Sequence, residues 1–163
     1  MEPRSWKDSY AVMQRIVLPP DTNVFNSLYG GRLMEWIDNV ASIVAFKHSR
    51  RNAVTGSIDS LYFLTPIKMG DIVTIEARIN YVTRETMEIE ATVVSEDHMT
   101  GDRRFTTKAF LTYIAVDNYG KPVQVPPLKL ETDDDRKRWE EGAERSDRRK
   151  SQLVEIKKNL PEI

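Results

Sequence analysis

The sequence predicts an α+β fold in which one long helix packs against a curved antiparallel sheet. Two observations carry this prediction. Residues 31–48 are apolar around most of the circumference of a helix, so this segment needs cover on nearly every side. Between residues 53 and 116, segments with strand character are separated by short breaks of turn residues, which is typical of antiparallel neighbours. With 163 residues, the chain is long enough for one domain with a substantial core.

The segment before the helix predicts a strand and a loop. Residues 10–18 (YAVMQRIVL) are rich in β-branched and apolar residues, and the prolines directly after them end the strand. The polar residues 21–29 then form a loop that leads into the helix at residues 31–48. The centre of the apolar face of the helix consists of residues at helical spacing: Leu33, Ile37, Val40 and Val44.

The strands predicted after the helix are residues 53–65, 71–83, 86–96 and 103–116. The middle two alternate apolar and polar residues, as expected of strands with one face on the core. We expect residues 1–128 to form the folded domain and residues 129–163 to form a charged helical tail. In that tail, apolar residues are spaced like a contact stripe on a helix: Leu153, Ile156 and Leu160.

The composition excludes several classes of protein and site. The absence of cysteine rules out disulfides, thiolate metal sites and a cysteine nucleophile. A formal net charge of -1 gives no global field that would attract nucleic acid or an anionic membrane. The longest nearly apolar run, residues 40–46, is far too short to span a bilayer, and the N-terminal residues lack the apolar core of a signal peptide. We therefore expect a cytoplasmic protein with no membrane and no nucleic-acid partner.

The familiar catalytic motifs are missing from the sequence. It has no nucleophile elbow, no HExxH zinc motif, no phosphate-binding loop and no dinucleotide-binding glycine motif. A structural role is favoured for His48, which closes the predicted helix, and we expect His98 to be solvated in a polar hairpin. The chemistry that remains is a carboxylate acting with water, with no metal and no cofactor.

Asp38 is the candidate carboxylate. On a helical wheel it lies beside Met34 and Ala45, at the edge of the apolar face. Periodicity alone favours a structural interpretation, in which Asp38 pairs with an arginine or caps a neighbouring loop. The functional interpretation is a general base or a nucleophile that faces a substrate lying along the helix.

Gly30 and Gly31 stand at the start of the helix, where unpaired N–H groups and the positive end of the helix dipole point outward. Those donors could stabilise an oxyanion, and the absence of a Cβ would let a carbonyl approach closely. A tight turn is the ordinary alternative for adjacent glycines. Asn23, in the preceding loop, could add a side-chain amide, or it could form an Asx-turn after Pro20.

Taken together, these motifs resemble the acyl-CoA thioesterases of the hotdog fold, in particular the brain-type acyl-CoA hydrolases and their bacterial relatives. The pattern is PxDTN, an aromatic-Gly-Gly, a helix that bears WID, then VTGSIDS and FLTPIKMGDIV, in that order over roughly residues 10–125. The resemblance implies a long central helix wrapped by the sheet, pairing of two such units through a continuous sheet, and often a trimer of dimers. It also implies hydrolysis of a fatty acyl-CoA to free acid and CoA.

The resemblance assigns roles to individual residues. The family's catalytic asparagine falls on Asn23 and its catalytic aspartate on Asp38, and relatives contribute these two residues from opposite subunits. Gly30 and Gly31 would face the thioester carbonyl. Contacts to CoA are implied for residues on the strand after the helix and in a later turn: Thr55, Ser57, Asp59, Arg84 and Thr86.

Three residues depart from the family pattern. Tyr29 stands where phenylalanine or histidine is usual before the glycines. Thr83 replaces a glycine that is common before the arginine of the phosphate turn, and Glu85 adds a negative charge there.

Two other functions on the same fold are alternatives to hydrolysis. A non-catalytic acyl-CoA sensor would bind the ester without cleaving it, and such a protein usually carries an effector domain. A hydratase or dehydratase generally needs a catalytic histidine paired with an acid, and neither histidine of this chain has such a partner near the glycines.

Overall fold

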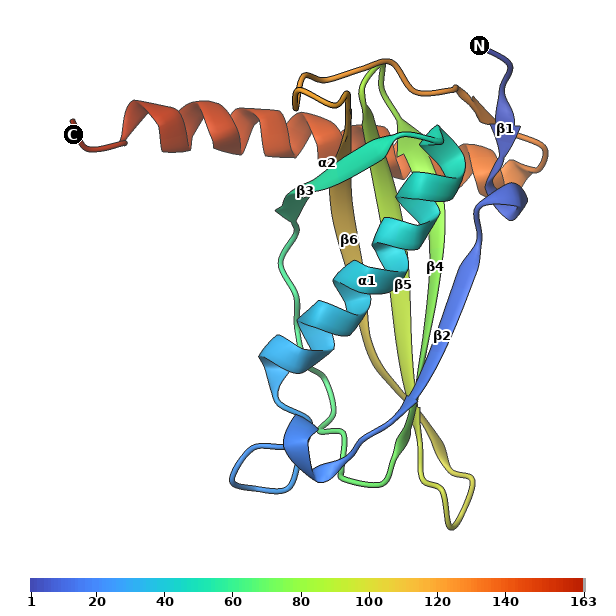
Figure 1. The fold of residues 1–163 in the computed structure, drawn as a ribbon, viewed down its shortest axis with the longest axis vertical. Helices are drawn as coiled ribbons and strands as arrows, with labels where there is room; N and C mark the ends of the chain where they lie inside the picture. The colour runs from blue at the N-terminus through green and yellow to red at the C-terminus, as the bar shows by residue number, and fades with distance from the viewer. Residues whose placement is uncertain (163) are drawn as a thin grey trace.

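The computed structural model describes residues 1–162 and confirms the α+β architecture (Figure 1). Short 3-10 helices occupy Trp6–Asp8 and Pro19–Asp21. The predicted strands at residues 86–96 and 103–116 agree with β5 and β6. The helices and strands follow in the order β1 (Arg4–Ser5), β2 (Ala11–Ile16), α1 (Gly30–Ser49), β3 (Asn52–Ile58), β4 (Ile72–Val82), β5 (Thr86–Glu96), β6 (Arg103–Val116), β7 (Leu128–Lys129) and α2 (Asp133–Lys158).

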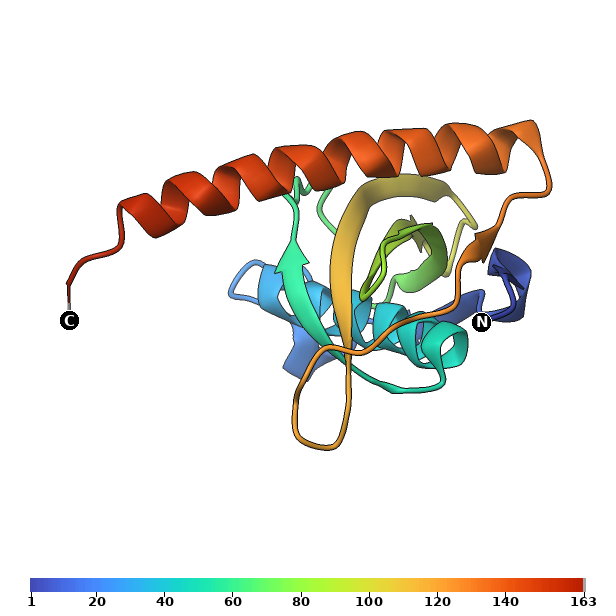
Figure 2. The same ribbon diagram turned by 90° about the horizontal axis from the view of Figure 1, so that it is seen from above.

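The main sheet is antiparallel, and its strands follow the order β2-β4-β5-β6-β3, so β2 and β3 are its two edges. β1 and β7 form a small parallel pair of their own. The sheet curls around α1, and α2 crosses the opposite face of the sheet, as Figure 2 shows. The two faces of the sheet therefore meet different surroundings: an apolar helix on the inside and a charged helix on the outside.

α1 is buried through the apolar face that the sequence predicts. Leu33 is 2% exposed, and Ile37, Val40 and Val44 are exposed by 1% or less. Each side chain of this kind contributes about 1.5–3 kcal/mol when it is fully buried, so this face holds α1 against the sheet. The helix ends at Ser49 because Arg50 adopts a left-handed conformation with a φ of 54°.

β3 is shorter than the strand predicted at residues 53–65, because its ladder with β6 ends at Ile58. A β-bulge at Gly56 already shifts the register within the strand. Beyond Ile58, the chain keeps only isolated bonds to β6, such as the 3.2 Å bond that the Leu64 amide donates to the Thr106 carbonyl. The apolar residues that made this segment look like a strand belong to an extended connection instead.

His48 has the structural role that the sequence favours. Its side chain is 1% exposed, and Nε2 lies 2.9 Å from the carbonyl oxygen of Pro126, so Nε2 carries the hydrogen of this bond. Burial lowers the pKa of His48, so the ring is uncharged at neutral pH and does not act as a cation for the helix dipole. His98 is exposed in the turn between β5 and β6, as expected.

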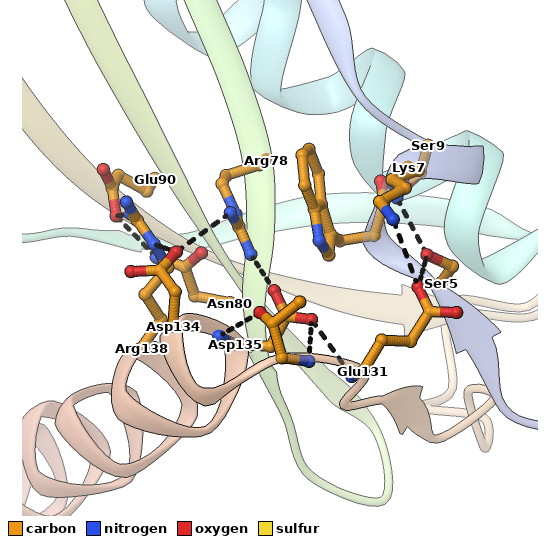
Figure 3. Close-up of polar contacts among 12 residues, drawn as sticks. Ser5, Lys7, Ser9, Arg78, Asn80, Glu90, Glu131, Asp134, Asp135 and Arg138 are labelled. Atoms are coloured by element: carbon orange, nitrogen blue, oxygen red, sulfur yellow. Dashed lines mark hydrogen bonds and ion pairs between the residues drawn. The ribbon is translucent and has the colours of Figure 1, made fainter.

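α2 begins with a capping box and an ion pair that fix its first turns to the sheet (Figure 3). The Asp135 carboxylate accepts from the Thr132 amide at 3.1 Å and from Arg78 on β4 at 3.0 Å. Burial alone would raise the pKa of Asp135, but backbone amides and the Arg78 guanidinium outweigh burial and hold this pKa below its usual range. One turn later, Arg138 donates to Glu90 on β5 at 2.9 Å.

Gly142 lets the middle of α2 lie directly on the sheet. A Cβ there would be 2.6 Å from the Tyr81 Cβ and 3.1 Å from a carboxylate oxygen of Glu88. Gly142→Ala is therefore expected to destabilise the protein by about 1–3 kcal/mol, because overpacking outweighs a gain in helix propensity of about 1 kcal/mol. Urea unfolding measures the change. Ser151→Ala, at an exposed position of the same helix, is the control and should be neutral or slightly stabilising; equal behaviour of the two variants would contradict the close contact.

The tail predicted at residues 129–163 contains α2, whereas β7 crosses its predicted start, and α2 lies against the sheet that also covers α1. The division of the chain at residue 128 stays a prediction. In the part of the chain that the structure describes, no helix has the length and apolar character needed to cross a membrane.

Candidate active site

Two hydroxyl groups hold the carboxylate of Asp38. The side chain is half-buried on α1, and Thr55 on β3 donates to its Oδ1 at 2.7 Å. Tyr113 on β6 donates to the same oxygen at 2.6 Å. Thr55 and Tyr113 are cross-strand partners in the β3–β6 ladder, which explains why both reach one atom. Short bonds from hydroxyl groups to a carboxylate fix its orientation as well as its position.

The Tyr113 hydroxyl links Asp38 to Ser42, one turn further along α1, which donates to it at 3.2 Å. Burial and the bond to Asp38 raise the pKa of Tyr113, so the hydroxyl keeps its proton at neutral pH and acts as a donor. The sequence analysis missed this residue. Tyr113 occupies a core-facing position between Leu111 and Ala115, and a buried phenol needs a polar partner, which is the signal that could have found it.

The second carboxylate oxygen of Asp38 is open. Among residues 1–162, the hydrogen bonds that this carboxylate accepts all end at Oδ1, and no arginine pairs with it. The structural interpretation through an arginine is therefore not supported by this part of the chain. An oriented carboxylate with one free oxygen can take a proton from water or attack a carbonyl carbon.

The first turn of α1 presents unpaired backbone donors. Tyr29, the N-cap residue, supplies no side-chain hydrogen bond, and within the described residues the amides of Gly30 and Gly31 have no acceptor. The ring of Phe63 lies 3.2 Å from the place of a Cβ on Gly30, and the ring of Tyr29 lies 3.2 Å from the place of a Cβ on Gly31. A larger residue at either position would push the neighbouring aromatic ring aside by a few tenths of an ångström, so the first turn packs closely against both rings.

Asn23 lies in an exposed loop before α1, and its side-chain oxygen organises that loop. Oδ1 accepts from the amide of Phe25 at 2.9 Å and from the amide of Ser27 at 3.3 Å. This is the Asx-turn that the sequence left open as one interpretation. The turn uses only the oxygen, so the Nδ2 hydrogens, for which no acceptor is found in residues 1–162, can still donate to a ligand.

The candidate CoA contacts on β3 differ in their surroundings. Thr55 is exposed and bonded to Asp38, whereas Ser57 is half-buried past the bulge. Asp59 follows the end of β3, and its Oδ2 accepts from Arg149 on α2 at 3.1 Å. The end of β3 is therefore tied to the outer helix of the same chain.

The turn between β4 and β5 carries Arg84 at an exposed position. The hydroxyl oxygens of Thr83 and Thr86 lie 2.6 Å apart, and the Thr86 amide donates to the Thr83 hydroxyl at 3.1 Å. Thr83, one of the departures from the family pattern, thus closes this turn by hydrogen bonding. Within residues 1–162, no hydrogen bond joins this turn or Asn23 to Asp38, and no cluster of three His, Asp or Glu side chains is arranged for a metal ion.

Comparisons with known proteins agree with this architecture. A family model described as Thioesterase superfamily matches residues 25–101. The uncharacterized acyl-CoA thioester hydrolase YkhA of Bacillus subtilis (strain 168) is 41% identical over 150 residues, which cover 92% of this chain and 87% of YkhA. The chain belongs to the thioesterase superfamily. Another thioesterase, the cytosolic acyl coenzyme A thioester hydrolase of Rattus norvegicus, is 36% identical over 143 residues; the match covers 86% of this chain but only 38% of the rat protein.

Solved thioesterase structures share the fold over nearly the whole chain. An apo-hexameric acyl-CoA thioesterase has a TM-score of 0.89 at 35% identity, with 94% of this chain and 98% of that chain covered. The acyl-CoA hydrolase from Staphylococcus aureus, in complex with butyryl coenzyme A, coenzyme A and coenzyme A disulfide, has a TM-score of 0.87 at 35% identity, with 95% and 94% covered. The sheet wrapped around α1 is the hotdog fold that the resemblance implies.

Proposed function

We propose that this chain hydrolyses acyl-CoA thioesters to a free fatty acid and CoA. The observation that carries the proposal is the Asp38 carboxylate, which Thr55 and Tyr113 fix at one oxygen and leave open at the other. The names of the Bacillus subtilis and rat relatives support the substrate class, as does the butyryl coenzyme A complex of the Staphylococcus aureus enzyme. We assign the reaction to the cytoplasm, in keeping with the name of the rat relative.

In the proposed reaction, the thioester carbonyl lies at the first turn of α1. The amides of Gly30 and Gly31 and the side-chain amide of Asn23 donate to its oxygen and stabilise the developing charge. Asp38 removes a proton from water as the water attacks the carbonyl carbon, or it attacks directly and forms an anhydride that water opens. In either case the C–S bond breaks and the CoA sulfur takes up a proton. The proposed reaction uses no metal and no cofactor.

The site is proposed to form between two subunits. No hydrogen bond joins Asn23 to Asp38 within the described chain, and β3 is an edge strand that a second copy could extend. The name of the hexameric relative supports assembly into a trimer of such dimers. CoA would then contact Thr55, Ser57, Asp59, Arg84 and Thr86. Large apolar side chains are exposed near β3 and the Asn23 loop, as expected of a surface between copies: Val24, Phe25, Val54, Tyr62 and Leu64.

Variants of the Staphylococcus aureus acyl-CoA hydrolase give additional support. Its solved structures include variants in which an asparagine, an aspartate or a threonine is replaced by alanine. The substituted positions are spaced along that enzyme as Asn23, Asp38 and Thr55 are spaced along this chain. This agreement is what we expect if the three pairs of residues correspond.

The experiment that tests the function follows CoA release from acyl-CoA esters of graded chain length, with binding of the same esters measured in parallel. We expect release of one CoA for each free acid formed. Binding without release would contradict hydrolysis and favour the sensor alternative. Conversion of an enoyl-CoA or hydroxyacyl-CoA with the thioester left intact would favour the hydratase alternative instead.

Tyr113→Phe tests whether the buried hydroxyl orients Asp38. We expect kcat to fall by roughly tenfold with little change in KM, because one of the two donors to Oδ1 is lost while the ring still fills the core. Ser42→Ala removes only the outer bond of the chain and should have a smaller effect on kcat. Steady-state kinetics measure both variants, and unchanged kcat in Tyr113→Phe would contradict the orienting role.

A further inference from the structure

α2 crosses the outer face of the sheet and then passes its edge. Its first half is tied to β4 and β5 by the ion pairs described above, and Arg145 continues this series through a 2.7 Å contact with Glu88 on β5. Arg149 makes the last of these contacts, to Glu88 at 3.0 Å and to Asp59 beyond β3 at 3.1 Å. Beyond Arg149, the helix projects past the edge strand β3, as Figure 2 shows. We call residues 151–160, all of which are exposed, the overhang.

The contact face of α2 continues along the overhang. Its members recur every three or four residues, as on one face of a helix, and they run through Gly142 and Arg149 to Leu153, Ile156 and Leu160. Over the sheet, this face is polar or small apart from one aromatic contact with β4, and past Arg149 it becomes apolar. Leu153 is 51% exposed, Ile156 is 57% exposed and Leu160, two residues after the end of α2, is 63% exposed. The contact stripe predicted from the sequence thus stays more than half exposed in its own chain.

The change in residue type coincides with the edge of the sheet. Glu155, Lys157 and Lys158 lie around the rest of the helix circumference, and Val154, which is 54% exposed, is the one apolar residue of the overhang that lies off the stripe. The first half of this helix face packs on the sheet, and the second half has no surface of its own chain to pack on. We take this as an indication that the second half packs on another molecule. The free edge of β3 is the place where the sheet itself can continue.

We propose that Leu153, Ile156 and Leu160 dock on the outer face of a second copy of this chain, whose sheet continues from β3. This inference rests on the subunit pairing through β3 described under the proposed function. In a pair related by a two-fold axis, each overhang crosses the junction of the two sheets and lies on the partner beside the partner's α2. The overhang then belongs to the same interface that brings Asn23 and Asp38 together.

Paired substitutions on opposite sides of the overhang test the proposal. Leu153→Ser with Ile156→Ser removes the apolar stripe, and Glu155→Ser with Lys158→Ser changes the opposite side of the helix without altering the net charge. Sedimentation velocity over a dilution series gives the dissociation constant of the dimer. We expect it to rise by roughly a hundredfold in the first variant and to stay near wild type in the second. Equal dissociation constants for all three proteins would overturn the proposal.

The Leu153→Ser, Ile156→Ser variant could weaken the dimer simply by unfolding the end of α2. Labelling of single cysteines tests the proposal without that substitution. The chain has no cysteine, so Ile156→Cys and Glu155→Cys each introduce a single reporter. At concentrations where the assembly is intact, a thiol reagent should label the first slowly and the second rapidly, and dilution should equalise them. Equally rapid labelling in the intact assembly overturns the proposal. Stripe substitution that separates hexamers into stable dimers would place the overhang between dimers and overturn its position across β3.

The test of the docking proposal and the test of hydrolysis can fail independently. CoA release by the wild-type protein is assayed on its own, so a protected stripe in an inactive protein would leave this inference standing and remove the proposed function. A wild-type chain that is monomeric but releases CoA would overturn the docking proposal and leave hydrolysis standing.

Discussion

Asp38→Ala is expected to lower the turnover of acyl-CoA by about two to four orders of magnitude while the affinity for CoA changes little. The carboxylate is the group that either activates water or attacks the thioester, whereas Thr55 and the groups expected to bind CoA stay in place. The measurement is kcat from CoA release together with the Kd of CoA. Substitution by asparagine as a second variant keeps the size of the side chain and an oxygen that Thr55 and Tyr113 can bond. It should be as inactive as the alanine variant.

Glu35→Ala is the matched control for this experiment. Glu35 lies one turn earlier on the same helix and is an exposed carboxylate paired with Arg32 at 2.9 Å. Its removal changes the charge of the chain as much as the removal of Asp38 does. Unchanged turnover in Glu35→Ala would therefore show that the loss in Asp38→Ala comes from the carboxylate at position 38 and not from the change in net charge. Normal turnover in both Asp38 variants would remove Asp38 from the mechanism.

A single-turnover reaction in water labelled with heavy oxygen can identify Asp38 as a nucleophile, because only the anhydride route can place the label on Asp38. If Asp38 acts as a base, the label enters the fatty acid in the first turnover, because water attacks the thioester itself. If Asp38 is the nucleophile and water opens the anhydride at the aspartyl carbon, the label stays on Asp38 and the first fatty acid is unlabelled. Mass spectrometry of the acid and of the peptide that contains Asp38 distinguishes these results.

Arg145→Ala is expected to destabilise the fold by roughly 3 kcal/mol. Glu88 is 1% exposed, and Arg145 donates to both of its oxygens while the guanidinium stacks 3.8 Å from the centroid of the Phe110 ring. Removing Arg145 leaves the buried carboxylate of Glu88 with only one of its two arginine partners. The estimate lies at the lower end of the range for a broken buried pair because Arg149 still bonds Glu88.

Urea unfolding at a fixed protein concentration measures this loss, since stability depends on concentration if the chain self-associates. Arg136→Ala is the control. It removes an arginine from the exposed side of the same helix, where the 3.2 Å pair with Asp133 is open to solvent, and we expect little change. The double variant Arg145→Met with Glu88→Leu should recover much of the stability, because it removes the buried charge along with its partner. A loss no larger than that of the control would show that water already compensates Glu88.

Most of the fold could be predicted because hydrophobic periodicity determines it. β4 and β5 alternate between core and outer face, and α1 has an apolar face wide enough to require a curled sheet. The segment at residues 59–65 misled the prediction because apolar residues between strands look the same whether they pair in a sheet or cover a helix terminus. Phe63 does the latter, against Gly30.

The contact between α2 and the sheet could not be found by the same means. Its members are arginines, carboxylates, a glycine and one tryptophan, and a helix that packs mainly through charged residues has the composition of a solvated surface. Only the pairing of specific charges on separate elements distinguishes the two cases, and that pairing exists in three dimensions alone. The stripe at Leu153 and Ile156 could be predicted from spacing, but its partner surface could not.

The candidate site divides in the same way. Asp38, Gly30 and Gly31 are visible in sequence because an acid on an apolar helix and paired glycines at a helix start are unusual. Tyr113 is harder to find because an aromatic residue in a strand normally indicates the core, and the sequence does not show that the polar partner of its buried hydroxyl is Asp38. The Asx-turn of Asn23 shows that a structural and a functional interpretation of one side chain can coexist on different atoms.

The two helices are held to opposite faces of one sheet by different forces, and the composition of the solvent therefore acts on them differently. The contacts of α1 are apolar, so excluded solutes such as sulfate strengthen them. The contacts of α2 are largely ionic and partly open to water, so simple salt weakens the more exposed of them by screening. If α2 detached, water would hydrate the charged groups that now form ion pairs, and the exposed face of the sheet would be largely polar. Ionic strength and lyotropic salts are thus separate controls over the outer and inner layers of this domain.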